Sequence, residues 1–482
     1  MSTTADASST NPNVTVHNRG RLLQVLGMWF GIAAAIGNTI AAGIVRTPGN
    51  VAQQLPHAWL FLGVWVLGGL YALVGASSMA ELGAMIPRSG GQYNFARRGV
   101  GEYAGFLVGW SDWLSTCGTN AAVAIVIGEY TVALINMLYK HVPRLAEFVR
   151  GLGDQQLNLL IKLLAVSVLL FFAILQWRGV KWGSGMQLVT AAMKTGAFIV
   201  VVVACFLLGG NLRQSAAAAS APAPALHLGW PFITAFLVAL QAVIYTVDGW
   251  DGVIYFGAEV KNPARDVPRA IFGSVFSIMG IYLLLNAAVL YVLPMNEIAG
   301  NTFALGAAAN RIFGHLGDPI IRLIMIVSLL SCINACQMFA ARTLFAMSSD
   351  RLFFKQASHV NKGGTPVVSL LLSTVIGIIF ILGSFERVIA MLSFFFVANY
   401  TLSYLALFRL RKTEPDLERP YRAWGYPWTS ALALAASIIF LIASLATDRS
   451  NAPLAFLILV LSYPIYRLMK WASAAVDNPT GA

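Results

Sequence analysis

The chain has 482 residues, of which 58% are hydrophobic and only 11% are charged. Soluble globular proteins contain about 45–50% apolar and about 25% charged residues, so this composition excludes a soluble globular enzyme and a disordered chain. The net charge of +12 would suit a nucleic-acid-binding protein, but the basic residues lie in short loops between long apolar runs, where membrane topology explains them.

The first 21 residues are polar and have no apolar core followed by a cleavage site, so we interpret 1–21 as a cytoplasmic tail rather than a signal peptide. Twelve apolar runs follow, each long enough to cross about 30 Å of hydrocarbon. Backbone polar groups in lipid must be bonded internally, which makes each run a predicted helix. The runs are 24–47, 57–84, 103–138, 157–177, 185–209, 231–257, 270–294, 318–347, 366–384, 388–408, 427–447 and 452–469.

The basic residues predict how these spans are oriented. With the N-terminus inside, 21 of the 32 Lys and Arg residues fall in cytoplasmic segments and nine fall in outer segments. Cytoplasmic loops carry an excess of Lys and Arg, so we expect both termini in the cytoplasm. An even number of spans agrees with this orientation.

An Ala/Pro/Ser-rich stretch at 216–225 separates two sets of five spans of similar length. The first set occupies 22–209 and the second 231–410, with an outer linker at 210–230 between them. Five is odd, so the second set enters the membrane from the opposite side, as in a pair of inverted repeats. The remainder, 411–482, supplies two extra helices and a short cytoplasmic tail.

The first and sixth runs are interrupted at corresponding places. The first contains Ala41-Ala42-Gly43 and the sixth contains Asp248-Gly249-Trp250-Asp251. Glycine weakens a helix, and a carboxylate is costly in hydrocarbon unless it faces a cavity. Paired interruptions indicate a transporter binding site, whereas the alternative is two ordinary glycine kinks. We predict irregular backbone at Ala41–Gly43 and Thr246–Gly249, near mid-membrane and facing each other.

Such breaks free backbone groups that can bind a ligand. Free backbone N–H groups in helix one can bind a carboxylate, and free carbonyls in helix six can accept from an ammonium. The N–H candidates are Ile40, Ala41, Ala42, Gly43 and Ile44, and the carbonyl candidates are Tyr245, Thr246 and Asp248. Packing is the alternative role for Tyr245, and capping or structural pairing is the alternative for Asp248 and Asp251.

Lys194 is the most unusual charged residue. Helix five begins near Gly185 on the cytoplasmic side, so nine residues at 1.5 Å each place Lys194 about 13–14 Å deep, beyond easy snorkelling. A charge at that depth is a functional-site hypothesis by default, and a purely structural pairing is the alternative.

The other charged residues and the cysteines within the spans are predicted to have mainly structural roles. Arg46 lies close enough to the outer end of helix one to snorkel, and Glu81 is predicted to pair with Arg88 or Arg98. A cavity-facing role is left open for Asp112 and Glu129. The four cysteines lie inside apolar runs and are interpreted as buried free thiols. The sequence contains no phosphate-binding loop and no His/Cys metal cluster, so we expect no enzyme activity, cofactor or metal.

Several motifs lie in the order and spacing of a known family. They are Ala80-Glu81-Leu82, Pro87-Arg88-Ser89-Gly90-Gly91-Gln92-Tyr93, Gly109-Trp110, Asp248-Gly249-Trp250, Glu259-Val260-Lys261-Asn262-Pro263, Pro268-Arg269-Ala270, Arg419-Pro420-Tyr421-Arg422 and Gly425-Tyr426-Pro427. Through them the chain resembles the amino acid–polyamine–organocation transporters, most closely the L-type amino acid transporter branch. It departs from that family at Ala41-Ala42-Gly43, where Gly-Ser-Gly is usual, and at Asp350-Arg351, where Asp-Gly is usual.

The resemblance implies an all-α membrane protein with 12 transmembrane helices. Two inverted five-helix repeats would form a LeuT-like fold with two extra helices, and helices 1 and 6 would be broken. It also implies that Tyr245 closes over the substrate and that Trp250 lines the pocket. Lys194 would lie where sodium-coupled relatives bind their cation and would tie helix one to helix eight, with Ser331 and Asn334 as its helix-eight partners.

We therefore expect a sodium-independent secondary transporter of amino acids in the plasma (inner) membrane, working by alternating access. Neutral amino acids, carried by exchange or proton symport, are the expected substrates. A cationic amino acid or polyamine transporter is one alternative, and a non-transporting amino acid sensor is another. The expected partners are the small-molecule substrate and the lipid bilayer, without nucleic acid and without a partner subunit.

Overall fold

The computed structural model describes residues 22–139, 141–209, 229–383, 385–447 and 451–477. The predicted tail 1–21 and most of the linker 210–230 lie outside these residues. Every regular element within them is helical, apart from three isolated β-bridges. The predicted all-helical class is therefore confirmed.

Long α-helices are interspersed with short helices and 3₁₀ turns along the chain. In chain order they are α1 (Met28–Thr39), α2 (Gly43–Gln54), α3 (Ala58–Met85), α4 (Gln92–Gly99), α5 (Glu102–Met137), α6 (Pro143–Arg150), α7 (Asp154–Trp177), α8 (Val180–Leu208), α10 (Trp230–Val247), η1 (Gly252–Tyr255), η2 (Gly257–Glu259), α11 (Pro263–Val292), α12 (Met295–Ile298), α13 (Ala304–Phe313), η3 (Gly314–Leu316), α14 (Gly317–Ser349), η4 (Lys355–Ser358), α15 (Val367–Leu382), α16 (Phe385–Thr413), α17 (Trp428–Thr447) and α18 (Ala452–Asp477).

Nine helices in the described ranges are long and apolar enough to cross a membrane, or ten if α1 and α2 form one bent span. Each of the twelve predicted apolar runs overlaps a helix, including the shorter α15 and the long α16. The count of twelve spans and the inverted repeats stay predictions. In the numbering of predicted spans, helix five is α8, helix seven is α11, helix eight is α14 and helix ten is α16.

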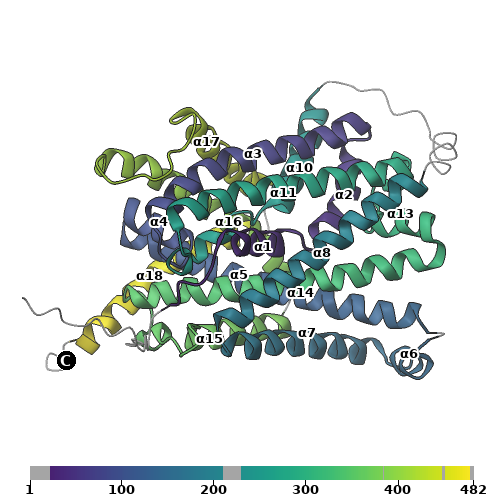
Figure 1. The fold of residues 1–482 in the computed structure, drawn as a ribbon, viewed down its shortest axis with the longest axis horizontal. Helices are drawn as coiled ribbons and strands as arrows, with labels where there is room; N and C mark the ends of the chain where they lie inside the picture. The colour runs from purple at the N-terminus through teal and green to yellow at the C-terminus, as the bar shows by residue number, and fades with distance from the viewer. Residues whose placement is uncertain (1–21, 140, 210–228, 384, 448–450, 478–482) are drawn as a thin grey trace, which may run out of the picture.

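Two long buried helices, α5 and α14, run along each other through the middle of the bundle (Figure 1). The helix α1 packs against α8, α11 and α14, whereas α7 and α15 lie together along one edge. Large apolar side chains are exposed on α7, α8 and α17, among them Ile174, Val200 and Ile439. Such exposed apolar faces suit helices in contact with lipid, because hydrocarbon carries no penalty for them.

Both predicted interruptions lie close to their expected positions. The helix α1 ends at Thr39 and α2 begins at Gly43, with a bend of 53° between them. The helix α10 ends at Val247 and is followed by a turn in which Gly249 has φ +103°, a left-handed conformation that favours glycine. The irregular residues are thus 40–42 and 248–251, so Gly43, Thr246 and Val247 are helical, contrary to the prediction.

The shift has a packing reason. A Cβ on Gly43 would lie 3.0 Å from Cγ2 of Thr246, so glycine permits close approach of α2 and α10 rather than unwinding of helix one. A Cβ on Gly249 would lie 2.3 Å from Nδ2 of Asn38. The two breaks therefore contact each other directly.

Candidate functional site

A cavity of about 370 Å³ lies between the two interruptions. This volume falls in the range of about 300–1,000 Å³ that is typical of small-molecule sites. Six of the predicted binding residues line the cavity, namely Ala41, Ala42, Gly43, Tyr245, Thr246 and Asp248. Ile40 and Ile44 are buried outside its lining. Trp250 lines a small adjoining pocket and stacks on Tyr400, with ring centroids 5.7 Å apart.

Lys194 is fully buried against the break in helix one. Its ammonium donates hydrogen bonds to the carbonyl oxygens of Gly37 and Ile40, both at 3.0 Å. The hydroxyl of Ser328 on α14 donates to the same Ile40 oxygen at 2.5 Å. Lysine and helix eight therefore meet at a shared carbonyl of helix one.

Ser331 and Asn334 do not bond Lys194 among the described contacts. Both bond Gln187 of α8 instead, with Gln187 Nε2 donating to the Ser331 hydroxyl and Asn334 Nδ2 donating to Gln187 Oε1. The reason is the level of each residue along α14, because Ser328 lies about one helical turn closer to the break. The predicted contact with helix eight therefore involves Ser328, one helical turn from the predicted Ser331.

Tyr282 of α11 joins the two breaks, a role that sequence reasoning missed. Its hydroxyl lies 2.8 Å from the carbonyl oxygen of Thr39 and 3.2 Å from that of Thr246, so one proton is shared between the ends of α1 and α10. The hydroxyls of Thr47 and Thr246 lie 2.6 Å apart and link α2 to α10. A hydroxyl in the middle of a predicted span was the only sequence signal for Tyr282.

Three carboxylates line the cavity: Asp112 on α5, and Asp248 and Asp251 in the turn after α10. The hydroxyls of Tyr255 and Thr343 donate to the two oxygens of Asp112 at 2.8 and 3.0 Å. Gln92 Nε2 donates to Asp251 at 3.0 Å. The sequence left a cavity-facing role open for both Asp112 and Glu129 on predicted helix three. Asp112 lines the cavity, whereas Glu129 is exposed.

Free thiols also reach the cavity. Cys332 and Cys336 line it from α14, and Cys336 Sγ lies 2.9 Å from the side-chain oxygen of Asn38. All four cysteines are buried and unbridged, as predicted. In the part of the chain that the structure describes, no three His, Cys, Asp or Glu side chains gather as metal ligands would.

A pair of stacked rings lines the cavity, and a buried ion pair lies near these rings in the chain. Tyr255 and Phe339 stack with centroids 4.5 Å apart. Close by in the chain, Glu259 accepts two bonds from the Arg342 guanidinium, at 2.7 and 2.8 Å, with both side chains almost fully buried. This pair joins the segment after broken helix six to α14.

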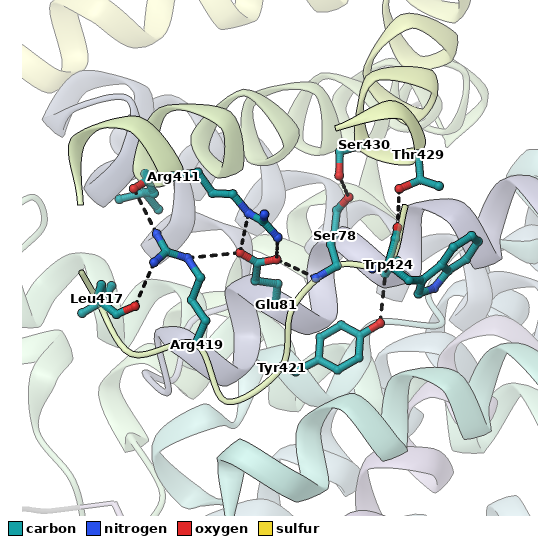
Figure 2. Close-up of polar contacts among 12 residues, drawn as sticks. Ser78, Glu81, Arg411, Leu417, Arg419, Tyr421, Trp424, Thr429 and Ser430 are labelled. Atoms are coloured by element: carbon teal, nitrogen blue, oxygen red, sulfur yellow. Dashed lines mark hydrogen bonds and ion pairs between the residues drawn. The ribbon is translucent and has the colours of Figure 1, made fainter. Parts of the chain in front are cut away.

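Glu81 has different partners from those predicted. Figure 2 shows its carboxylate between Arg411, which donates to both oxygens at 2.9 and 2.5 Å, and Arg419, whose Nε lies 3.3 Å away. The backbone N–H of Ala423 also donates to Glu81 at 2.7 Å. The partners differ from the prediction because α16 and the loop after it, which are distant in sequence, pack against α3.

Arg88 and Arg98, the predicted partners, are engaged elsewhere. Arg88 bonds Asp350 at 2.9 Å, and Arg98 bonds Glu414 at 2.7 Å. The Tyr93 hydroxyl donates to Asp350 at 3.0 Å. Burial, followed by the charge of Asp350, raises the pKa of Tyr93 well above its usual range, so this hydroxyl stays protonated and remains a donor.

The amino-acid sequence matches one family model and several characterised proteins. The amino acid permease family model matches residues 22–465. The chain is 29% identical to the serine/threonine exchanger SteT of Bacillus subtilis (strain 168) over 459 residues, covering 94% of this chain and 98% of that protein. It is 24% identical to the human b(0,+)-type amino acid transporter 1, covering 83% and 79%. It is also 24% identical to the mouse Asc-type amino acid transporter 1, covering 84% and 73%.

Proposed function

The chain belongs to the amino acid permease family, and we propose that it is a sodium-independent secondary transporter of amino acids that works by alternating access. Membership confirms the resemblance found in the motifs, and the apolar helices agree with a multi-pass membrane protein. The observation that carries the proposal is the cavity between two broken helices, with a buried lysine held at one break. Binding at broken helices between moving elements is the arrangement that secondary transporters use.

The cavity offers complementary groups to the two ends of an amino acid. The first N–H groups of α2 have no partner within the helix, and Ala42 and Gly43 at its start line the cavity, so we assign them to the substrate carboxylate. The Ala41 N–H already bonds the Thr39 carbonyl at 2.9 Å. The carbonyls at the end of α10, together with Asp248, would accept from the ammonium.

Neutral amino acids are our preferred substrates, supported by similarity to a protein named as a serine/threonine exchanger. A cationic substrate is the second candidate, because Asp112, Asp248 and Asp251 share the cavity. Purified protein in liposomes loaded with unlabelled L-serine should take up labelled L-serine and L-threonine faster than unloaded liposomes do. Absence of uptake for these amino acids and for L-lysine would favour a sensor and contradict the proposal.

Uptake should be independent of sodium. The carbonyls of Gly37 and Ile40 and the hydroxyl of Ser328 form a set of oxygens that would suit a small cation, but the Lys194 ammonium already bonds two of them. We expect replacement of external sodium by choline to leave the initial rate of L-serine uptake unchanged. A rate that collapses without sodium would refute the role assigned to Lys194.

We further propose that the protein lies in the plasma (inner) membrane with both termini in the cytoplasm and acts without a partner subunit. The distribution of basic residues supports this orientation. Uptake by the purified chain alone in liposomes tests the absence of a partner subunit in the same experiment.

A further inference from the structure

The cavity holds more negative charge than an amino acid can balance. Asp112, Asp248 and Asp251 all line it. A zwitterionic amino acid brings one ammonium and one carboxylate and is neutral overall. Arg46 also reaches the lining, but its side chain is exposed, and Lys194 is bonded to carbonyls of helix one outside the lining. With a neutral amino acid as the substrate, this negative charge is left to be balanced by another cation.

Among the residues that the structure describes, the groups that act on Asp112 are acids, hydroxyls and thiols. Asp251 and Asp248 act on it from the turn after α10, Cys336 from α14 and Cys117 from its own helix. Tyr255 and Thr343 donate to it, and the nearby Tyr400 interacts with the other two carboxylates from α16. Arg342, which precedes Thr343, is engaged by Glu259. Carboxylates that share a desolvated site do not all remain ionised without a cation.

Two buried polar atoms at the cavity wall point independently to a ligand. Asn399 Nδ2 and Thr39 Oγ1 have no hydrogen-bond partner among the described residues, although their residues are only 1% and 5% exposed. Both residues line the cavity that contains the carboxylates. Buried polar atoms of this kind hold ordered water or a bound ligand. Water at this wall would give Asp112 and Asp251 a route for protons.

We propose that Asp112 is the proton-binding residue of this transporter, with Asp251 as the second carboxylate of the site, so that amino acids are carried by proton symport. This inference rests on the proposed transport function and deepens it by naming the coupling ion and the residue that carries it. The proton adds to a carboxylate oxygen of Asp112 from cavity water and returns to water on the other side. No other bond forms or breaks.

The geometry links this proton to movement. Asp112 lies on α5, and its two donors lie on different elements, Tyr255 in η1 and Thr343 in α14. Protonation converts one carboxylate oxygen from an acceptor into a donor, so one of these bonds must weaken or reverse. Tyr255 also stacks on Phe339 of α14 at the wall of the cavity. A proton on Asp112 therefore changes the contacts among α5, η1 and α14 and shifts the balance between conformations.

The test measures protons and substrate together. Wild type, Asp112→Asn and a matched control, Glu129→Gln, are reconstituted in liposomes containing the trapped pH dye pyranine. Glu129 lies on the same helix and is exposed. An inward L-serine gradient is applied, and acidification of the lumen is measured per labelled L-serine transported. We expect acidification with wild type and Glu129→Gln, whereas Asp112→Asn should take up labelled L-serine with no more acidification than empty liposomes show.

An Asp112→Asn ratio equal to wild type would overturn the inference. So would net inward transport of L-serine or L-lysine by wild type without acidification of the lumen, although the proposed transport function would then stand. No exchange of any amino acid would instead defeat the proposed function. If Asp112→Asn does not fold, Tyr255→Phe replaces it. Loss of that donor should shift the pH midpoint of uptake upwards, because the ionised carboxylate loses a hydrogen bond, and an unchanged midpoint would count against the inference.

Discussion

Lys194→Ala is expected to give a folded protein whose transport turnover is reduced about 10- to 100-fold, because two charge-assisted hydrogen bonds that differ in strength between the transport states are lost. These bonds hold the Gly37 and Ile40 carbonyls of helix one against α8. Alternating access requires helix one to move, so we expect the bonds to hold in one state and loosen in another. Their loss would bias that equilibrium and change substrate affinity unequally on the two faces of the membrane.

The measurement compares purified Lys194→Ala with wild type by size-exclusion profile, by turnover in liposomes and by apparent affinity on each membrane face. Lys162→Ala is the matched control, because Lys162 bonds the Leu382 carbonyl at an exposed position on α7. A purely structural role would predict misfolding of Lys194→Ala alone. A well-folded Lys194→Ala with wild-type turnover would overturn the functional role.

The helices and the two breaks were predictable because their signals are local. A run of about 20 apolar residues specifies a spanning helix whatever lies around it. Glycine and aspartate within such a run mark an interruption, as at Gly249. The exact residues of each break were not predictable, because Gly43 is used for close packing on Thr246 rather than for unwinding. That distinction depends on a helix far away in the sequence.

The partners of buried polar residues were the least predictable part of the site. Ser328 rather than Ser331 reaches the break in helix one, and Tyr282 joins both breaks. Each contact depends on how a helix is rotated against its neighbours, which no single segment encodes. Helical periodicity alone does separate Asp112 from Glu129, since about 17 residues at 3.6 per turn direct their side chains about 100° apart. Which of the two faces the cavity required the packed structure.

A buried acid outside the cavity, Glu81, carries the second large prediction. Glu81→Ala should lower the free energy of unfolding by about 3–5 kcal/mol, the usual cost of removing one partner from a buried ion pair. Glu81 is fully buried, and the exposed fractions of the Arg419 and Arg411 side chains are 5% and 21%. The substitution leaves Arg411 without its bidentate acceptor and the Ala423 N–H without a partner. It therefore removes the ionic link of α3 to the end of α16 and to the loop before α17, which is drawn in Figure 2.

Glu414→Ala provides the comparison, because Glu414 also accepts two bonds from one arginine, Arg98, but both side chains are about one-third exposed or more. Water and salt screen such a pair, so its loss should cost only about 0–1 kcal/mol. Thermal unfolding of the two variants in the same detergent is followed by size-exclusion chromatography. The comparison of their melting temperatures separates the effect of burial on stability from the effect of ion pairing alone. Equal melting temperatures for Glu81→Ala and Glu414→Ala would mean that the Glu81 cluster contributes no more than a surface ion pair. A much lower melting temperature for Glu81→Ala alone would show that the loop before α17 is held to α3 by a desolvated carboxylate.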